Sequence, residues 1–297
     1  MTDPAWPTEQ FEEHRAHLRA VAYRMLGSVS EAEDAVQEAW LRLDRAGEDG
    51  IQNLRAWLTT VVGRVCIDML RARQSRHEEL VGTWLPEPVV AAAPEEVDPE
   101  QQALLADSVG LALLVVLEML SPAERLAFVL HDMFAVPFED IAPLVDRTPA
   151  AARQLASRAR RRVRARPTTP DVGVSAQRAV IDAFLAAARE GDFDALVATL
   201  DPDVVLRADG GAALAAASAE VRGALNVARQ AVMWSRVDLT MHPALVNGAA
   251  GVVATRKGVV FTIASVIVRN GKIAEIDFLA DPDRLARLDL TILDGRD

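Results

Sequence analysis

Apolar residues recur at the spacing of an α-helix in three segments near the N-terminus, at 11–26, 31–43 and 54–73. Gly27 and Ser28 end the first segment, and Ser30 stands where the N-cap of the second helix is expected. Asn53 leads into the third and longest segment. We therefore predict an all-α domain over residues 1–75.

A second helical pattern consists of a helix, a short turn and another helix. Residues 121–124 (Ser-Pro-Ala-Glu) have the order of a capping box, with proline at the first helical position. Helical spacing returns over 138–145 and is broken at Asp146. Thr148 is the predicted N-cap of the last helix and Pro149 its first residue. This order predicts a helix-turn-helix domain over residues 108–166.

The last helix of that domain combines an apolar stripe with an almost purely cationic remainder. Arginine occupies positions 147, 153, 158, 160–162, 164 and 166, and no acidic residue follows Asp146 in this segment. Such a helix can pack one side on a core and present the other to phosphates and base edges of DNA. A solvated helix face without a partner is the alternative interpretation.

The overall charge favours the opposite conclusion, because the formal net charge of −11 would repel nucleic acid. However, the cationic helix is preceded by a separate acidic stretch at 78–107, which contains eight acidic residues and no lysine or arginine. Because the negative and positive charges occupy separate segments of the chain, the cationic helix can still present a positively charged surface to DNA.

The segment 76–107 is rich in proline, alanine and acidic residues, and we interpret it as a linker. It contains the motif Trp-Leu-Pro-Glu-Pro at 84–88, in which two prolines favour an extended path and exclude a regular helix. We expect Trp84 and Leu85 either to dock on another domain or to pack locally on the nearest helix.

The pattern changes again after a hinge at 167–173. Helical spacing over 174–190 and around 196–200 is followed by alternating strands at 204–211, 239–246, 251–256, 259–269 and 272–279. Asn-Gly pairs at 247–248 and 270–271 predict hairpin turns. We predict helices and a curved antiparallel sheet, an α+β cone over 174–285, followed by a C-terminal tail over 286–297.

Several of these residues together resemble the extracytoplasmic-function sigma factors. The resemblance rests on Glu-Asp-Ala-Val-Gln-Glu-Ala-Trp at 33–40 and Arg-Ala-Trp-Leu at 55–58, followed by the helix-turn-helix in the expected order and spacing. It implies that the acidic helix docks on core RNA polymerase, at the clamp helices of the β′ subunit, through Asp34, Gln37 and Glu38. The second sigma domain would meet the β flap.

The resemblance also implies contacts with promoter DNA. The −10 element would be opened by residues of the third helix and the position before it: Asn53, Arg64, Asp68, Arg71 and Arg73. The −35 element would meet the cationic helix through Thr148, Ala150, Arg153, Gln154, Arg158, Arg160 and Arg161. From bidentate geometry, Arg153 suits guanine and Gln154 suits adenine.

Residues 84–88 and the segment 191–196 (Gly-Asp-Phe-Asp-Ala-Leu) are similar to a sigma subgroup with a C-terminal SnoaL-like (NTF2-like) domain. This similarity implies a regulatory contact between linker and tail domain through Trp84, Leu85, Pro86, Asp209, Asp283 and Arg284. The sequence departs from the subgroup at 212–213, where alanines follow Asp-Gly-Gly, and at Asp281, where the subgroup carries asparagine. The complete fold class predicted is two all-α sigma domains, the second a helix-turn-helix, followed by a SnoaL-like cone.

No phosphate-binding loop, nucleophile elbow or metal-ligand spacing is found in the sequence, so we expect no enzyme activity, cofactor or metal. Candidate pocket groups in the tail domain are Asp209, Trp234, Asp238, His242 and Asp277, which leave open an unknown small ligand. We expect His242 to be structural and Cys66 to be a buried thiol. The single cysteine and the lack of a signal or membrane segment favour a cytoplasmic location without a membrane partner.

The resemblance implies an alternative sigma factor whose fused tail domain regulates it. Two other functions stay open at this point. A ligand-sensing helix-turn-helix regulator would leave the acidic second helix unexplained. An isomerase or cyclase with a DNA-binding appendage would need a catalytic base and a substrate.

Overall fold

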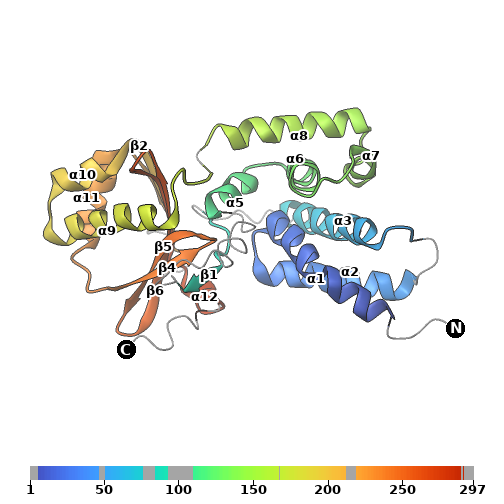
Figure 1. Ribbon diagram of the computed structural model, residues 1–297, viewed down its shortest axis with the longest axis horizontal. Helices are drawn as coiled ribbons and strands as arrows, with labels where there is room; N and C mark the ends of the chain where they lie inside the picture. Colours follow the sequence, from blue (N-terminus) through green and yellow to red (C-terminus); the bar gives the residue numbers. More distant parts are fainter. Residues whose placement is uncertain are drawn as a thin grey trace. The chain divides into compact units, whose positions relative to one another are not determined.

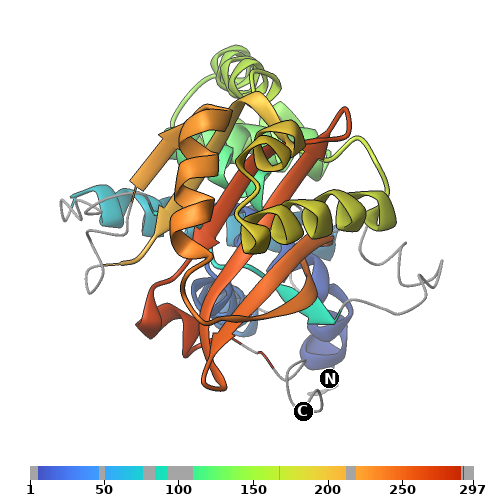
Figure 2. The same cartoon turned by 90° about the vertical axis from the view of Figure 1, so that its left-hand side faces the viewer.

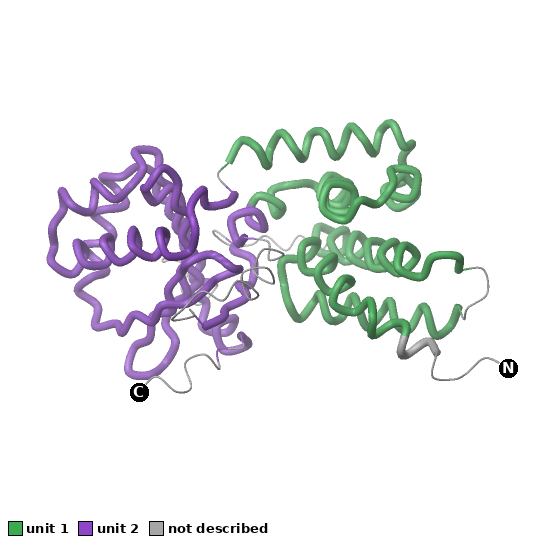
Figure 3. Tube along the Cα trace, in the orientation of Figure 1, with its two compact units in different colours: residues 1–79, 116–166 green, residues 80–115, 167–297 purple. Residues whose placement is uncertain are grey.

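The chain forms two compact units in a computed structural model that describes residues 6–46, 51–75, 84–92, 110–166, 168–211, 219–288 and 290, with side chains from residue 10. The helical unit comprises residues 1–79 and 116–166, and the tail unit comprises 80–115 and 167–297 (Figure 3). The middle of the linker therefore belongs to the tail unit, although it stands between the two parts of the helical unit in sequence.

Three helices form the first part of the helical unit: α1 (Trp6–Leu26), α2 (Val29–Ala46) and α3 (Leu54–Ser75) (Figure 1). Their facing sides carry fully buried side chains such as Leu18, Val36 and Leu58. The start of α2 was predicted two residues too late. Ser28 rather than Ser30 caps it, because the Ser28 hydroxyl accepts the backbone N–H of Glu31 at 3.3 Å.

The second part of this unit follows α5 (Leu111–Glu118) and contains α6 (Pro122–Phe128), η1 (Val129–Met133), α7 (Phe138–Ile141), η2 (Ala142–Val145) and α8 (Pro149–Arg164). The capping box at Ser121 and Glu124 is present. Asp146 takes the left-handed conformation (φ 54°) that ends η2, and the Thr148 hydroxyl caps α8 at the N–H of Ala151. These contacts confirm the predicted helix, turn and helix.

The tail unit is built on one seven-stranded sheet of order β1-β4-β5-β6-β7-β2-β3. Its strands are β1 (Val90–Ala92), β2 (Leu200–Asp209), β3 (Ala219–Arg222), β4 (Thr240–Val246), β5 (Ala249–Arg256), β6 (Val259–Arg269) and β7 (Lys272–Leu279). Both Asn-Gly pairs form hairpin turns with positive φ at each residue, as predicted.

Helices α9 (Val174–Glu190), α10 (Phe193–Thr199) and α11 (Ala224–Trp234) cover one face of this sheet (Figure 2). The core between them contains Ile181, Leu196 and Val227 from the helices, together with Leu206 and Ile276 from the strands. A short helix, α12 (Pro282–Leu285), follows β7, and Leu285 joins a smaller apolar cluster with Val246 and Ile263. By strand alternation, this second cluster lies on the sheet face away from α9–α11.

The predicted fold class, two helical sigma domains followed by an α+β domain, is confirmed, but the sheet is not purely antiparallel. β2 pairs in parallel with β7 and antiparallel with β3. Three elements, β1, β3 and α11, were not predicted from the sequence. The linker residues 76–83 and 93–107, Ala212 and Ala213, and most of the C-terminal tail lie outside the described residues.

Candidate nucleic-acid interface and linker contacts

Helix α8 is held on its core by Ala152, Leu155, Ala156 and Ala159, which are all buried. The opposite side carries Ala150, Gln154, Ser157 and Arg161, all exposed and spaced so that they share one helix face. This row is free of large apolar groups. It has the shape and the donors required to enter a major groove.

Four arginines beside this row contact acidic or aromatic residues of the same domain. Arg158 and Arg162 both pair with Glu124 of α6, at 3.1 and 2.8 Å. Arg160 pairs with Asp132 of η1 at 2.5 Å. The guanidinium of Arg153 lies over the Phe138 ring, 5.2 Å from its centroid.

Glu124 is the centre of this arrangement, with only 8% of its side chain exposed. Burial by itself raises the pKa of Glu124, but hydrogen bonds from Ser121 and the charges of Arg162 and Arg158 lower it below its ordinary value. The carboxylate therefore stays ionised at neutral pH.

Of the residues predicted for the −35 element, all but Arg160 are exposed, namely Thr148, Ala150, Arg153, Gln154, Arg158 and Arg161. Arg158 and Arg160 are also paired with carboxylates. Ser157 was not predicted as a candidate, although it is exposed on the same side of α8. Helical spacing from Gln154 would have identified Ser157.

The residues predicted for the −10 element are dispersed along α3 rather than gathered in one cluster. The Asn53 side chain caps α3 by accepting the N–H of Ala56 at 3.0 Å. Arg64 and Asp68 are exposed and face each other at 3.5 Å. Arg73, also predicted for the −10 element, is largely buried instead: it pairs with Glu31 of α2, and 18% of its side chain is exposed.

Arg71 links the two parts of the helical unit, because its guanidinium lies 3.3 Å from the carboxylate of Asp146 in the helix-turn-helix turn. Further contacts join the same two parts. A Cβ at Gly63 of α3 would lie 3.0 Å from a methyl carbon of Leu130, which shows how closely the two parts pack there. The rings of His17 and Phe134 meet edge-on at 5.2 Å.

The residues predicted to bind polymerase lie on the outer side of α2. Asp34 and Gln37 are exposed, and Glu38 pairs with Arg42 at 3.0 Å. Beside them an open groove of about 370 Å³ runs between α1 and α2, lined by Phe11, Glu12, Arg15, Glu33, Val36, Gln37 and Trp40.

The structure brings most of the predicted linker residues into contact with the tail domain. Leu85 is fully buried, and its N–H donates to Asp209 at the end of β2 at 2.8 Å. Arg284 of α12 donates to Asp209 at 2.6 Å and to the Leu85 carbonyl, and its guanidinium lies 4.9 Å from the Trp84 ring centroid. Asp283 is exposed and takes no part in this cluster.

Further along the linker, Val89 and Asn247 exchange two hydrogen bonds of 2.8 and 3.0 Å, and residues 90–92 then pair with β4. Asn247 was predicted only as a turn residue. Its side chain also holds the linker, and the sequence contains no signal for this second role.

The geometry at the end of β2 explains why glycine stands at position 211 in the Asp-Gly-Gly segment. The Gly211 N–H donates to Asp209 at 3.0 Å, and Gly211 has a positive φ of 62°. A Cβ at this position would lie 2.1 Å from the carboxylate of Asp281, which caps α12. Glycine is therefore required where the ends of β2 and β7 meet.

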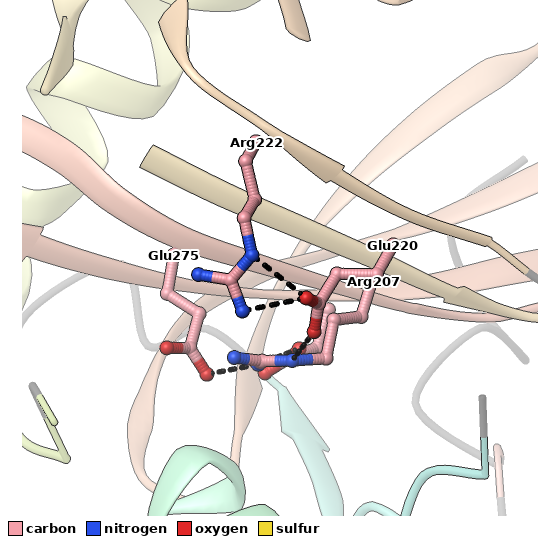
Figure 4. Close-up of polar contacts among 5 residues, drawn as sticks. Arg207, Glu220, Arg222 and Glu275 are labelled. Carbon is pink, nitrogen blue, oxygen red and sulfur yellow. Dashed lines mark hydrogen bonds and ion pairs between the residues drawn. The ribbon is translucent and has the colours of Figure 1, made fainter. Parts of the chain in front are cut away.

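A buried polar cluster lies next to Asp209 on the same sheet face. Arg207 bonds Glu275, Asp277 at 2.9 Å and Glu220 at 3.2 Å, and Glu220 also binds Arg222 (Figure 4). Burial and the neighbouring Glu275 carboxylate raise the pKa of Asp277 to about 8, against the opposing charge of Arg207.

The five candidate pocket groups do not line one cavity. By strand alternation, Asp209, Asp277 and His242 lie on the sheet face away from α9–α11, whereas Trp234 and Asp238 are exposed. His242 shares a 3.0 Å hydrogen bond with Thr255, which agrees with a structural role.

The thiol of Cys66 is buried as predicted, and burial raises its pKa. In the part of the chain that the structure describes, no group of three His, Cys, Asp or Glu side chains could hold a metal ion. None of the described helices has both the length and the apolar composition of a bilayer span.

Comparison with known proteins matches both parts of the helical unit. The family described as Sigma-70 region 2 matches residues 10–76, and the family Sigma-70, region 4 matches residues 110–163. The ECF RNA polymerase sigma factor SigJ of Mycobacterium tuberculosis is 41% identical over 291 residues, covering 93% of this chain and 92% of the relative. The probable ECF RNA polymerase sigma factor SigI of that species is 35% identical over 277 residues, covering 92% of each chain.

The crystal structure of Mycobacterium tuberculosis SigJ has the same fold over nearly the whole length. It aligns with a TM-score of 0.72 and 38% identity, and covers 95% of this chain and 99% of that chain. The similarity therefore extends through the tail unit as well as both helical parts.

The raised pKa of Asp277 predicts a pH effect on the tail unit. An acid whose pKa is higher in the folded state binds its proton more tightly there, so folding stability falls as pH rises from about 4 toward 8. Asp277→Asn removes this dependence while keeping an acceptor for Arg207. We expect the variant to lose less stability than wild type between pH 5 and 8, by ~1 kcal/mol or more.

Hydrogen exchange of peptides from β2 and β7 at several pH values measures this difference. Asp238→Asn, at an exposed carboxylate, is the matched control. If wild type and Asp277→Asn showed parallel pH profiles, the assignment of a proton to this cluster would be wrong.

Proposed function

The chain belongs to the extracytoplasmic-function (ECF) RNA polymerase sigma factors, and we propose which of its surfaces carry out each step of initiation. As an alternative sigma factor it binds core RNA polymerase and promoter DNA and directs transcription. In our proposal α8 reads the −35 element, α3 with Asn53 opens the −10 element, and α2 binds polymerase.

The observation that carries the −35 assignment is the outward row of α8. Ala150, Gln154, Ser157 and Arg161 lie on one exposed face, opposite the residues that hold the helix on its core. In a major groove this face meets base edges, and the flanking arginines meet the phosphates on either side.

The polymerase assignment is supported by charge and exposure on α2. Asp34 and Gln37 are exposed, and Glu38 bonds only the neighbouring turn of its own helix among the interactions described. We propose that these side chains meet the β′ clamp helices and that the second sigma domain meets the β flap.

We also propose that the helical unit as described is a resting form. The −10 and −35 elements are ~25 base pairs apart, which is ~80 Å along B-DNA at about 3.4 Å per pair. Arg71 at the end of α3 is instead 3.3 Å from Asp146 in the turn before α8. One duplex cannot meet both helices until this contact opens.

The tail unit is the proposed regulator of that opening. It holds residues 84–92, which belong to the connection between the two sigma domains, through Asp209, Arg284 and Asn247. A linker held as a strand and a buried loop cannot extend freely. The tail unit then replaces a separate anti-sigma protein.

Reconstitution with core RNA polymerase tests the reading of the −35 element. Wild-type chain should form open complexes on members of a promoter library. Gln154→Ala should lower initiation about tenfold or more and relax the preference at one base pair, because a bidentate contact is worth about 1–3 kcal/mol of discrimination.

Gln230→Ala in α11 is the control and should initiate as wild type does. Failure of the wild-type chain to initiate on every library member would refute the assignment as a sigma factor. Unchanged base preference in Gln154→Ala would remove Gln154 from the reading face.

Crosslinking tests the resting form. His17→Cys and Phe134→Cys place two thiols at a contact between the two sigma domains, away from the proposed DNA and polymerase residues. Joining them with a short bismaleimide should abolish initiation, because the domains can no longer separate. The uncoupled double variant and the two treated single variants are controls, and an active crosslinked protein would contradict the proposal.

Arg284→Met tests the regulatory role of the linker contact. The change removes the ion pair with Asp209, the bond to the Leu85 carbonyl and the contact with Trp84. Amides of 84–90 should exchange at least tenfold faster, a loss of about 1.4 kcal/mol. Initiation should rise because the linker is released.

Arg287→Met, at an exposed arginine just after α12, is the matched control. Faster exchange without any change in initiation would separate the linker contact from regulation and contradict the proposed role.

A further inference from the structure

Three arginines of α8 are bound to carboxylates of the domain on which the helix packs. Arg158 and Arg162 share Glu124, and Arg160 pairs with Asp132. Arg158 and Arg162 lie on one flank of the outward row and Arg160 lies on the other. The two carboxylates therefore act on both sides of the reading face.

The same flanks are where DNA phosphates would lie. A helix seated in the major groove has base edges in front of it and a sugar-phosphate strand on each side. Arg158 and Arg162 have about half of their side chains exposed (50% and 53%), so they can reach these strands. This step rests on the proposed function of α8.

Glu124 cannot move away to release its partners. Its carboxylate accepts hydrogen bonds from the backbone N–H and the hydroxyl of Ser121, and it begins α6 as part of the capping box. Asp132 is 22% exposed and also faces α8 from the supporting side. Arg158 and Arg162 therefore meet a fixed negative charge before they meet DNA, and Arg160 meets a partly buried one.

We propose that Glu124 and Asp132 are specificity-determining residues that compete with phosphate for the flanking arginines of α8. Binding to arbitrary duplex depends almost entirely on cations that neutralise phosphates and release counterions. An arginine that is already paired with a carboxylate of the protein contributes less to this non-specific binding. The outward row at Gln154 and Ser157 stays available for base edges, so the ratio of promoter to non-specific affinity is higher than the arginine content alone would give.

A purely structural role makes a different prediction. If the pairs only clamped α8 to α6 and η1, loss of a carboxylate would loosen the helix and weaken all DNA binding in proportion. Competition with phosphate predicts the reverse for non-specific duplex, because a freed arginine adds a phosphate contact. The salt dependence of binding distinguishes the two roles.

The test uses the full chain with Glu124→Gln and Asp132→Asn. Affinity for a random-sequence duplex is measured by fluorescence anisotropy across a salt series. Each freed arginine should steepen the slope of log K against log salt by about 0.9 and tighten binding about 5- to 10-fold near ~0.1 M salt. Asp132→Asn frees one arginine outside the capping box, so its result stands even if Glu124→Gln is unstable.

Glu139→Gln is the matched control. Glu139 is exposed on α7 and pairs with no cation among the described residues, so its replacement makes the same change in net charge without freeing an arginine. It should leave the salt slope unchanged.

The second measurement is the specificity of the holoenzyme. A promoter selected with the wild-type holoenzyme is compared with a scrambled duplex, and both carboxylate variants should show a lower ratio of affinities at a Tm close to wild type. An unchanged slope and ratio would overturn the proposal, as would a lower Tm with a proportional loss on both duplexes. The random-duplex measurement does not depend on promoter reading, whereas a wild-type holoenzyme without any promoter preference would refute the proposed function itself.

Discussion

The pairing of arginines with carboxylates is the interaction on which the rest of the helical unit depends. In a helical unit rich in arginine, cationic side chains that pack against the protein need carboxylates nearby to offset their mutual repulsion. Glu124 does this for Arg158 and Arg162, and Asp146 does it for Arg71. The two ion pairs with Glu124 stay within one sigma domain, whereas the Arg71–Asp146 pair joins the two sigma domains. The same type of contact therefore both positions α8 and holds the helical unit closed.

The local rules of helix and turn formation made much of this fold predictable. The capping box at Ser121, the N-cap at Thr148 and both Asn-Gly turns depend on residues within three or four positions of each other, so their geometry can be deduced from the sequence. Ser30 failed as a predicted cap because Ser28, two residues earlier, offers the same hydroxyl and the hydrogen bond selects between them.

Contacts between residues far apart in sequence could not be deduced in this way. The partner of Arg73 is Glu31, 42 residues away, and nothing near Arg73 indicates that it is half-buried. The three residues of β1 form a strand because β4 pairs with them, and the parallel pairing of β2 with β7 follows from the order of the whole sheet. Resemblance placed Asp209 and Arg284 near the linker, but Asp283 was included with them and is exposed.

In the proposed resting form the two sigma domains are joined in the free chain, and they separate on the promoter. Fluorescent labels at Gln74→Cys in the last turn of α3 and Ala165→Cys after α8 report the distance between the two domains, and the buried Cys66 does not compete for label. Energy transfer should be high in the free chain and should be lost in an open complex with polymerase, where the two elements are ~80 Å apart on the DNA. High energy transfer that persists in a complex active in transcription would contradict the proposed separation.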